Sequence, residues 1–391
     1  MKRIILAAAA LAMLSANAQA ADRIRLGFQA GLSGAGIGGA VGEEQRRGLD
    51  LALEELGNTL GGLPVKLYVE DDNGNPAVAV QVASKLIDED HIDIVTGLTG
   101  SNTLIPVEKT YLNAGVFVIG ALAGPQEFAG KACSPNAFHT SFENEDWDDA
   151  LGKYMTDKGV KSVYFMGADY QAGWEKIAGA MRFYKGKAIG PVYTPLSQLD
   201  FAAEISQLQA AKPDAVFVFY PGGLGIAFLK QFDEAGLHGK IAIYSEDTIA
   251  SELSFPAEGN SALGIVQSTS WTPDLDNPAN KKFVASFVAK YGRRPTIFSA
   301  LQYDAVKLID SAVRAVHGKI EDKDAFRAAL DKADFHSVRG PFAFDNNHYP
   351  VQNIYITTVE KDAQGKLTTV LKATAVTGWH DIYHEQCKMT P

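Results

Sequence analysis

Two spacings of apolar residues alternate along the first 120 residues. Short apolar runs predict buried strands, and segments with apolar residues three and four positions apart predict helices between them. The strands are expected over residues 24–28, 65–70, 92–96 and 116–119, and the helices over 42–57, 78–87 and 102–113. Regular alternation of strand and helix is typical of a parallel sheet that helices cover on both faces.

The same alternation restarts after Phe138. Strands are expected over 162–166, 188–193, 215–220, 241–244 and 264–268, with helices over 172–185, 200–211 and 223–236. Residues 278–333 are predicted to be mostly helical, and the segments 342–344, 353–359 and 367–371 to be antiparallel strands. The pattern therefore predicts an α/β fold with two similar lobes, each built on a parallel sheet.

The chain must pass between these lobes without a low-complexity linker. Strand-like segments near residues 138–142, 267–271 and 335–338 are expected to make three crossings, which form a hinge rather than a tether. One lobe is expected to consist of residues 21–138 and 270–336, and the other of residues 139–269 and 337–391.

The first twenty residues predict a secretory signal rather than part of the fold. Lys2 and Arg3 precede an apolar run over 4–14, and small residues lead to a cleavage site after Ala20. No later segment has about 18 uninterrupted apolar residues. We expect an exported protein in the periplasm.

Composition narrows the function further. The 391 residues are 46% hydrophobic and 21% charged, which is typical of a globular protein, and the net charge of −10 argues against a nucleic-acid partner. Cys133 and Cys387 are too few for a disulfide scaffold. Export favours their pairing, although their separation along the chain says nothing of their distance in space.

Motifs for catalysis are weak. Gly34, Gly36 and Gly39 match the dinucleotide-binding spacing, but five residues separate the first glycine from its strand, so no cofactor is expected. His380, His384 and Cys387 could share a helical face and hold a metal, yet Cys387 has a competing disulfide fate, and we expect no metal. The alternative from another functional class is an exported enzyme that uses either Glu246 or the set of His380, His384 and Cys387 for catalysis.

The predicted strand ends are better suited to binding than to catalysis. In open α/β sheets, ligands bind beyond the carboxyl ends of the strands. The loops there are rich in Gly, Ser, Asn and Tyr, and Ser101 stands where a helix would begin, next to backbone N–H groups that attract a carboxylate. Two lobes with such loops predict a cleft that closes on a small ligand.

Several segments resemble the leucine/isoleucine/valine-binding family of type I periplasmic solute-binding proteins. The resemblance covers the whole mature chain and is carried by residues 24–28, 31–34, 70–76, 78–86, 169–173 and 200–201. It implies two Rossmann-like lobes with three hinge crossings and delivery of a loaded, closed form to the membrane permease of an ATP-driven importer. We expect a monomer, and a sensory receptor is an alternative recipient of the ligand.

The resemblance also assigns site residues. Of the paired hydroxyls that the family places on the substrate carboxylate, Gly100-Ser101 keeps one, and Ala123-Gly124 lacks the family's threonine. Tyr170 matches a family tyrosine, Gly223 replaces a second one, and Glu246 matches the acid that pairs with the ligand ammonium.

These departures change the expected ligand. They remove contacts to an amino group and enlarge the cleft, so a flat aromatic carboxylate could fill it, as in the branch of the family that binds lignin-derived acids such as p-coumarate. Branched-chain or other amino acids are the alternative. The expected ligand-binding residues are Ser101, Asn102, Ala123, Gly124, Phe142, Tyr170, Tyr220, Gly223, Glu246 and Trp271.

Overall fold

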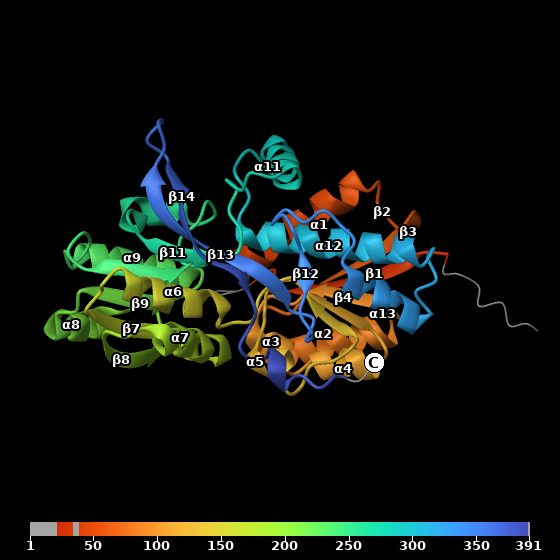
Figure 1. The fold of residues 1–391 in the computed structure, drawn as a ribbon, viewed down its shortest axis with the longest axis horizontal. Coiled ribbons are helices and arrows are strands. Elements are labelled where there is room, and N and C mark those ends of the chain that lie inside the picture. The colour runs from red at the N-terminus through yellow and green to blue at the C-terminus, as the bar shows by residue number, and fades with distance from the viewer. Residues whose placement is uncertain (1–21, 34–38, 390–391) are drawn as a thin grey trace, which may run out of the picture.

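Two α/β sheets, one in each lobe, lie side by side in the computed structural model, which describes residues 22–33 and 39–389 (Figure 1). The predicted signal with its cleavage site at Ala20 lies outside the described residues, and so do Gly34 and Gly36.

The first lobe is built on a six-stranded sheet in the order β2-β3-β1-β4-β5-β6, parallel except between β2 and β3. Its strands are β1 (Ile24–Ala30), β2 (Thr59–Leu60), β3 (Leu63–Asp71), β4 (Ile94–Gly97), β5 (Phe117–Gly120) and β6 (Ala137–His139). Its helices are α1 (Ala40–Glu55), α2 (Pro76–Asp88), α3 (Ser101–Leu104), α4 (Glu108–Asn113), α5 (Gln126–Ala129), α11 (Pro278–Tyr291), α12 (Ile297–Ala315) and α13 (Lys323–Lys332).

Successive strand residues of this sheet enter different cores, as the pleat of a strand requires. Ile94 lies in a core with Leu49 of α1 and Leu301 of α12, whereas its neighbour Val95 lies in a core with Val82 of α2. Helices therefore cover both faces, and the strand ends remain open at one edge.

The second lobe holds a sheet in the order β12-β13-β11-β10-β9-β7-β8, with β14 paired to β13. Its strands are β7 (Ser162–Ala168), β8 (Lys187–Thr194), β9 (Ala215–Phe219), β10 (Ala242–Glu246), β11 (Val266–Thr269), β12 (Ala343–Phe344), β13 (Pro350–Lys361) and β14 (Leu367–Trp379). Its helices are α6 (Asp146–Asp157), α7 (Gln171–Phe183), α8 (Ala202–Ala211), α9 (Gly223–Glu234) and α10 (Phe255–Glu258), with short 3-10 turns η1 (Gly259–Ala262) and η2 (His384–Gln386). The predicted antiparallel strands are confirmed and extend this sheet beyond β11.

Two elements differ from the sequence prediction. The single helix expected over 102–113 is divided into α3 and α4, because Pro106 lies between them and has no N–H group to continue a helix. Strand β14 continues past the predicted end at residue 371 to Trp379. Its second half is largely half-buried or exposed, so the sequence there shows no apolar alternation that would predict a strand.

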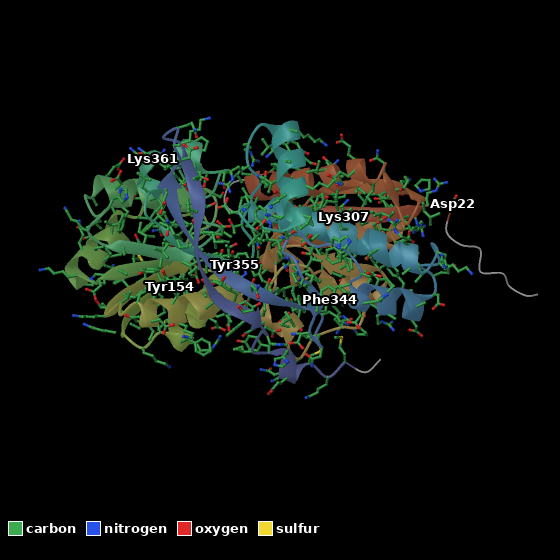
Figure 2. All side chains as sticks on the ribbon, turned by 45° about the horizontal axis from the view of Figure 1, so that its top comes forward. Asp22, Tyr154, Lys307, Phe344, Tyr355 and Lys361 are labelled. Carbon is green, nitrogen blue, oxygen red and sulfur yellow. A yellow bond between two sulfur atoms is a disulfide. The ribbon has the colours of Figure 1, made fainter. Side chains whose placement is uncertain are left out.

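The chain passes between the lobes three times. Residues 140–145 join β6 to α6, residues 270–277 join β11 to α11, and β13 makes the third crossing (Figure 1). Tyr355 of β13 belongs to the core of the first lobe, whereas the next residue, Ile356, belongs to the second. Figure 2 shows Tyr355 near the middle of the molecule and Lys361 at the far end of the strand. The fold therefore has a three-segment hinge, as the sequence predicts, but the third crossing lies within β13 rather than near residues 335–338.

A buried arginine ties the first and third crossings together. The guanidinium of Arg339 donates to the backbone oxygens of Thr140 (2.7 Å) and Ser141 (3.3 Å) and to the side chain of Gln352 on β13 (3.3 Å). Asp304 of α12 accepts from the same guanidinium at 3.3 Å. Because both charges are buried, the pair holds the crossings in place as a unit.

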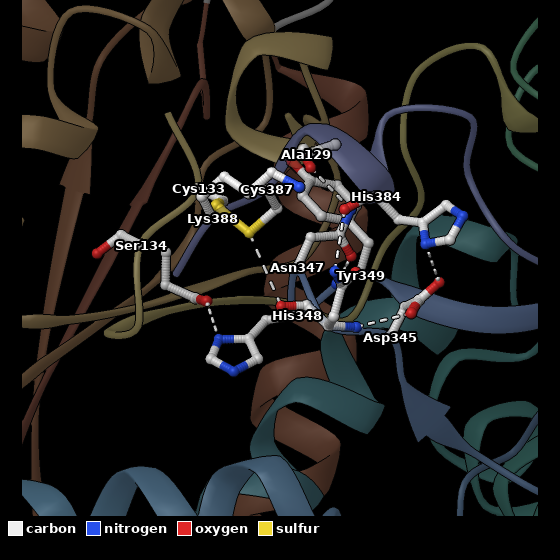
Figure 3. The surroundings of a disulfide bond; sticks show 12 residues. Ala129, Cys133, Ser134, Asp345, Asn347, His348, Tyr349, His384, Cys387 and Lys388 are labelled. Atoms are coloured by element: carbon white, nitrogen blue, oxygen red, sulfur yellow. Dashed lines mark hydrogen bonds and ion pairs between the residues drawn. A yellow bond between two sulfur atoms is a disulfide. The ribbon is translucent and has the colours of Figure 1, made fainter. Parts of the chain in front are cut away.

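A disulfide fastens the C-terminal tail to the first lobe. Cys133 and Cys387 are bonded, with their Cα atoms 5.7 Å apart (Figure 3). Nearby, the Asn347 side chain donates to the backbone oxygen of Ala129 at 2.8 Å. The sequence prediction assigns residues 337–391 to the second lobe; in the structure, these contacts place residues near 347 and 387 against the first.

Loss of this disulfide is expected to destabilise the protein. Cys387→Ser should lower the free energy of unfolding by about 2–4 kcal/mol, because a cross-link between residues 254 positions apart restricts the unfolded chain. Guanidinium unfolding of the two proteins measures the difference. Cys133→Ser and the double variant remove the same bond and should show the same loss. Unfolding curves that do not change on reduction would contradict the assignment.

Candidate functional site

A cavity lies between the lobes at the carboxyl ends of the strands. Its lining consists of Val41, Thr99, Gly100, Ser101, Leu122, Ala123, Phe142, Asn144 and Phe298 on one side, and Tyr170, Ala172, Lys176, Phe219, Pro221, Glu246 and Thr248 on the other. The cavity volume is about 40 Å³, so the two lobes leave only a narrow space between them in this structure. Helices α3 and α7 contact each other across it, so the lobes are close together here.

The ammonium group of Lys176 on α7 is buried in the wall of this cavity. It forms an ion pair with Glu246, donates to the backbone oxygen of Asn144 at 3.0 Å, and lies 3.7 Å from the carboxylate of Asp148. It also lies 4.9 Å from the centre of the Phe142 ring. Burial alone lowers the pKa of Lys176, but the carboxylates of Glu246 and Asp148 outweigh this effect and raise it. Lys176 is therefore a cation at neutral pH.

Asn144 links the two lobes beside the cavity. Its side-chain NH2 group donates to Ser101 Oγ at 3.0 Å and to Glu175 Oε2 of α7 at 2.7 Å, and its oxygen accepts from the N–H of Gly124 at 3.2 Å. Because Ser101 Oγ accepts this bond, its own hydroxyl hydrogen can donate to a ligand. Asn144 also belongs to the first crossing, so the hinge and the site share a residue.

Half of the ligand-binding residues predicted from the sequence line the cavity. Ser101, Ala123, Phe142, Tyr170 and Glu246 all line the cavity. Burial, with the nearby charge of Glu246, raises the pKa of Tyr170 well above its usual value. Its hydroxyl is therefore a neutral group that can donate a hydrogen bond.

Two of the predicted aromatic residues lie in the cores instead. The Tyr220 ring packs against Phe201 and Phe228 in the second lobe, at centre-to-centre distances of 4.8 and 5.3 Å. Trp271 is buried in the first lobe, where its indole N–H donates to Asn280 at 2.7 Å. Both rings follow strands whose ends approach the cleft, but they turn inward to fill the cores.

The remaining predicted residues lie outside the lining as well. Asn102 donates to the backbone oxygen of Gly74 at 2.9 Å and so fastens two loops. A Cβ atom on Gly124 would lie 1.8 Å from the carbonyl oxygen of Phe142, so this glycine permits close backbone packing rather than enlarging the cleft. Gly223 begins α9, with open space around it.

Sequence analysis missed Lys176, Asn144, Phe219 and Phe298. A signal for Lys176 exists, because it stands on the apolar face of its helix between Ala172 and Ala180 at four-residue spacing. Phe298 comes from α12, far along the chain, and only the packing of that helix against α1 brings it to the cavity.

Comparison with known proteins agrees with this arrangement. The chain is 27% identical to a Leu/Ile/Val-binding protein homolog 6 from Brucella melitensis over 376 residues, which cover 93% of this chain and 95% of the relative. It is also similar to a solved ABC transporter solute-binding protein from R. palustris in complex with benzoate (29% identity, TM-score 0.88, 94% of this chain and 100% of that one). A second R. palustris protein, in complex with 4-hydroxybenzoate, has 26% identity and a TM-score of 0.85, with 92% and 99% covered.

Two hinged lobes around a small cavity define a ligand-binding protein. The chain belongs to the periplasmic binding protein family, whose model matches residues 23–365. Of the helices that the structure describes, none combines the length and the apolar character needed to cross a bilayer.

Removal of the buried cation is expected to destabilise the cleft. Lys176→Met should lower the free energy of unfolding by about 3–5 kcal/mol, because the carboxylate of Glu246 then remains buried without a counter-ion. Urea unfolding followed by tryptophan fluorescence measures the change.

A matched control is Lys153→Met, which breaks an exposed ion pair with Asp157 on α6 and should have a much smaller effect. Adding Glu246→Gln to Lys176→Met should recover part of the lost stability. Equal losses for the Lys176 and Lys153 variants would contradict the buried-pair interpretation.

Proposed function

We propose that this chain captures a small aromatic carboxylate of the benzoate type and delivers it to the permease of an ATP-driven importer. One observation carries the choice of ligand: the carboxylate of Glu246, which the family resemblance assigns to a ligand ammonium, already binds the ammonium of Lys176.

The negative charge of Glu246 is already paired within the protein. Lys176 binds one of its oxygens and the Thr248 hydroxyl donates to the other. The neighbouring acid Glu175 accepts from Asn144 and Gln171. A ligand ammonium would therefore enter beside a fixed lysine cation, and like charges in a buried site repel each other strongly. A ligand without an amino group avoids this cost.

The rest of the cavity suits a flat ring with one acid group. Phe142, Tyr170, Phe219 and Phe298 supply aromatic wall, and such contacts add to the free energy of burying a ring. The Ser101 hydroxyl and the N–H groups at the start of α3 are donors for the carboxylate. Because Lys176 balances the charge of Glu246, that carboxylate does not repel the acid group of the ligand as an unpaired one would.

The comparisons support a benzoate-type ligand more directly than a hydroxycinnamate, because the similar solved proteins hold benzoate and 4-hydroxybenzoate. A branched-chain amino acid is the alternative ligand, because the Brucella relative is named a Leu/Ile/Val-binding protein homolog. We further propose that the chain acts in the periplasm as a monomer after cleavage at Ala20, and that it binds its ligand without converting it, because Glu246 is held in a buried ion pair.

The ligand class can be tested by thermal unfolding of protein refolded from denaturant, which removes any ligand carried through purification. Benzoate, 4-hydroxybenzoate, p-coumarate, leucine and valine form the panel. A ligand at 100 times its dissociation constant should stabilise the protein by about 2.7 kcal/mol. We expect stabilisation by the benzoates and recovery of the added acid unchanged. Stabilisation by leucine or valine alone would overturn the proposal, and turnover of the acid would favour an enzyme.

The carboxylate contact can be tested separately. Ser101→Ala should weaken benzoate binding by about 10- to 100-fold, because a hydrogen bond to a charged group contributes about 1.5–3 kcal/mol. Isothermal titration measures the change. Ser311→Ala, which removes a half-buried hydroxyl bonded within α12, is the matched control and should bind as the original protein does. Equal benzoate affinities for the original protein and both variants would show that Ser101 does not contact the ligand.

A further inference from the structure

Three metal-ligating side chains meet at the C-terminal tail, outside the cleft. Asp345 lies between β12 and β13, His380 follows β14, and His384 begins η2. The Nδ1 atoms of His380 and His384 lie 2.6 and 3.4 Å from the same oxygen of Asp345, Oδ2. One ligand atom from each residue lies within 4.8 Å of the other two.

This set differs from the combination of His380, His384 and Cys387 that the sequence analysis considers and rejects as a metal site. The sequence analysis pairs the two histidines with Cys387, but Cys387 is bonded to Cys133. The tail around His384 is a 3-10 turn rather than a long helix, and Asp345 from a different segment takes the third position. Two imidazoles and a carboxylate form a common donor set for zinc and similar transition-metal ions.

The surroundings hold these groups in place before any ion binds. The backbone N–H of Asn346 donates to Asp345 Oδ1 at 2.7 Å, which leaves Oδ2 directed at the imidazoles. The Asn346 side chain donates to the backbone oxygen of His384 at 3.0 Å. The disulfide fixes the chain three residues beyond His384, and Figure 3 shows the His384 ring turned toward Asp345 beside this bond. Hydrogen bonds from neighbouring groups to metal-ligating residues orient those residues and strengthen metal binding.

One of the separations between ligand atoms already matches that of a tetrahedral ion. Ligand atoms at about 2.0–2.1 Å from zinc lie roughly 3.3–3.4 Å from one another in a tetrahedron, close to the separation of His384 Nδ1 from Asp345 Oδ2. The shorter contact of His380 must lengthen as the ion replaces the hydrogen bond. Both imidazoles are reachable from solvent, with 53% of the His380 side chain and 31% of the His384 side chain exposed.

We propose that Asp345, His380 and His384 form a binding site for one Zn²⁺ or similar divalent transition-metal ion, with solvent at the fourth position. The ion joins the turn before β13 to the tail after β14. The same stretch of tail contacts the end of the first crossing, because Tyr383 donates to Glu145 at 2.9 Å. Metal binding therefore stiffens the tail beside the hinge, at a site separate from the cleft.

The test uses the mature, disulfide-bonded protein without a histidine tag, freed of metal by chelation. Isothermal titration with Zn²⁺ should give one site, and Co²⁺ should give the visible absorption bands of a tetrahedral complex. Zn²⁺ should also raise the midpoint of thermal unfolding, because it binds the folded protein alone.

Variants assign the ligands. His380→Ala, His384→Ala and Asp345→Asn should each weaken Zn²⁺ binding at least tenfold, whereas His336→Ala, which removes an exposed histidine elsewhere in the chain, should leave it unchanged. Circular dichroism establishes that each variant is folded. The absence of a one-to-one Zn²⁺ isotherm at micromolar protein, or unchanged affinity in the three ligand variants, would overturn the proposal.

Discussion

The buried ion pair between Lys176 and Glu246 is the interaction on which the cleft depends. A charge in the interior is costly unless it is paired and hydrogen-bonded, and here one ammonium is shared by a carboxylate, a backbone oxygen and an aromatic ring. The pair fixes α7 against β10 within the second lobe. Through Asn144 it also reaches the first crossing, so the side chain that neutralises Glu246 contacts the hinge.

This arrangement joins binding to closure. Asn144 contacts Ser101 from the first lobe and Glu175 from the second, while Arg339 holds the adjacent residues Thr140 and Ser141. A ligand that meets Ser101 on one side and Tyr170 on the other makes contacts with both lobes only when they are close. The free energy of those contacts then favours the closed form, which is the general basis of hinge closure around a ligand.

The ion pair also shows how one fold can serve different ligands. In the interpretation drawn from family resemblance, an acidic residue in the second lobe is a contact for an amino group. A lysine four positions from Ala172 satisfies that acid from within the protein and changes the charge that the cavity offers. In the proposed function, the paired carboxylate offers little to a ligand ammonium, so the cleft favours a ligand without an amino group while the fold and the hinge stay the same.

The sequence alone determined the order of strands and helices, the two lobes, the number of crossings with the positions of the first two, and several of the residues at strand ends, including Ser101, Tyr170 and Glu246. These features follow from local periodicity and from the rule that ligands bind beyond the carboxyl ends of parallel strands. The tertiary structure decided which side chains face the cavity. Tyr220 and Trp271 follow strands just as Tyr170 does, yet they fill cores, and Gly124 meets a carbonyl oxygen rather than open space. Phe298, Lys176 and the trio around Asp345 come together from distant segments. No local pattern encodes such a meeting, because it depends on how whole helices and strands pack against each other.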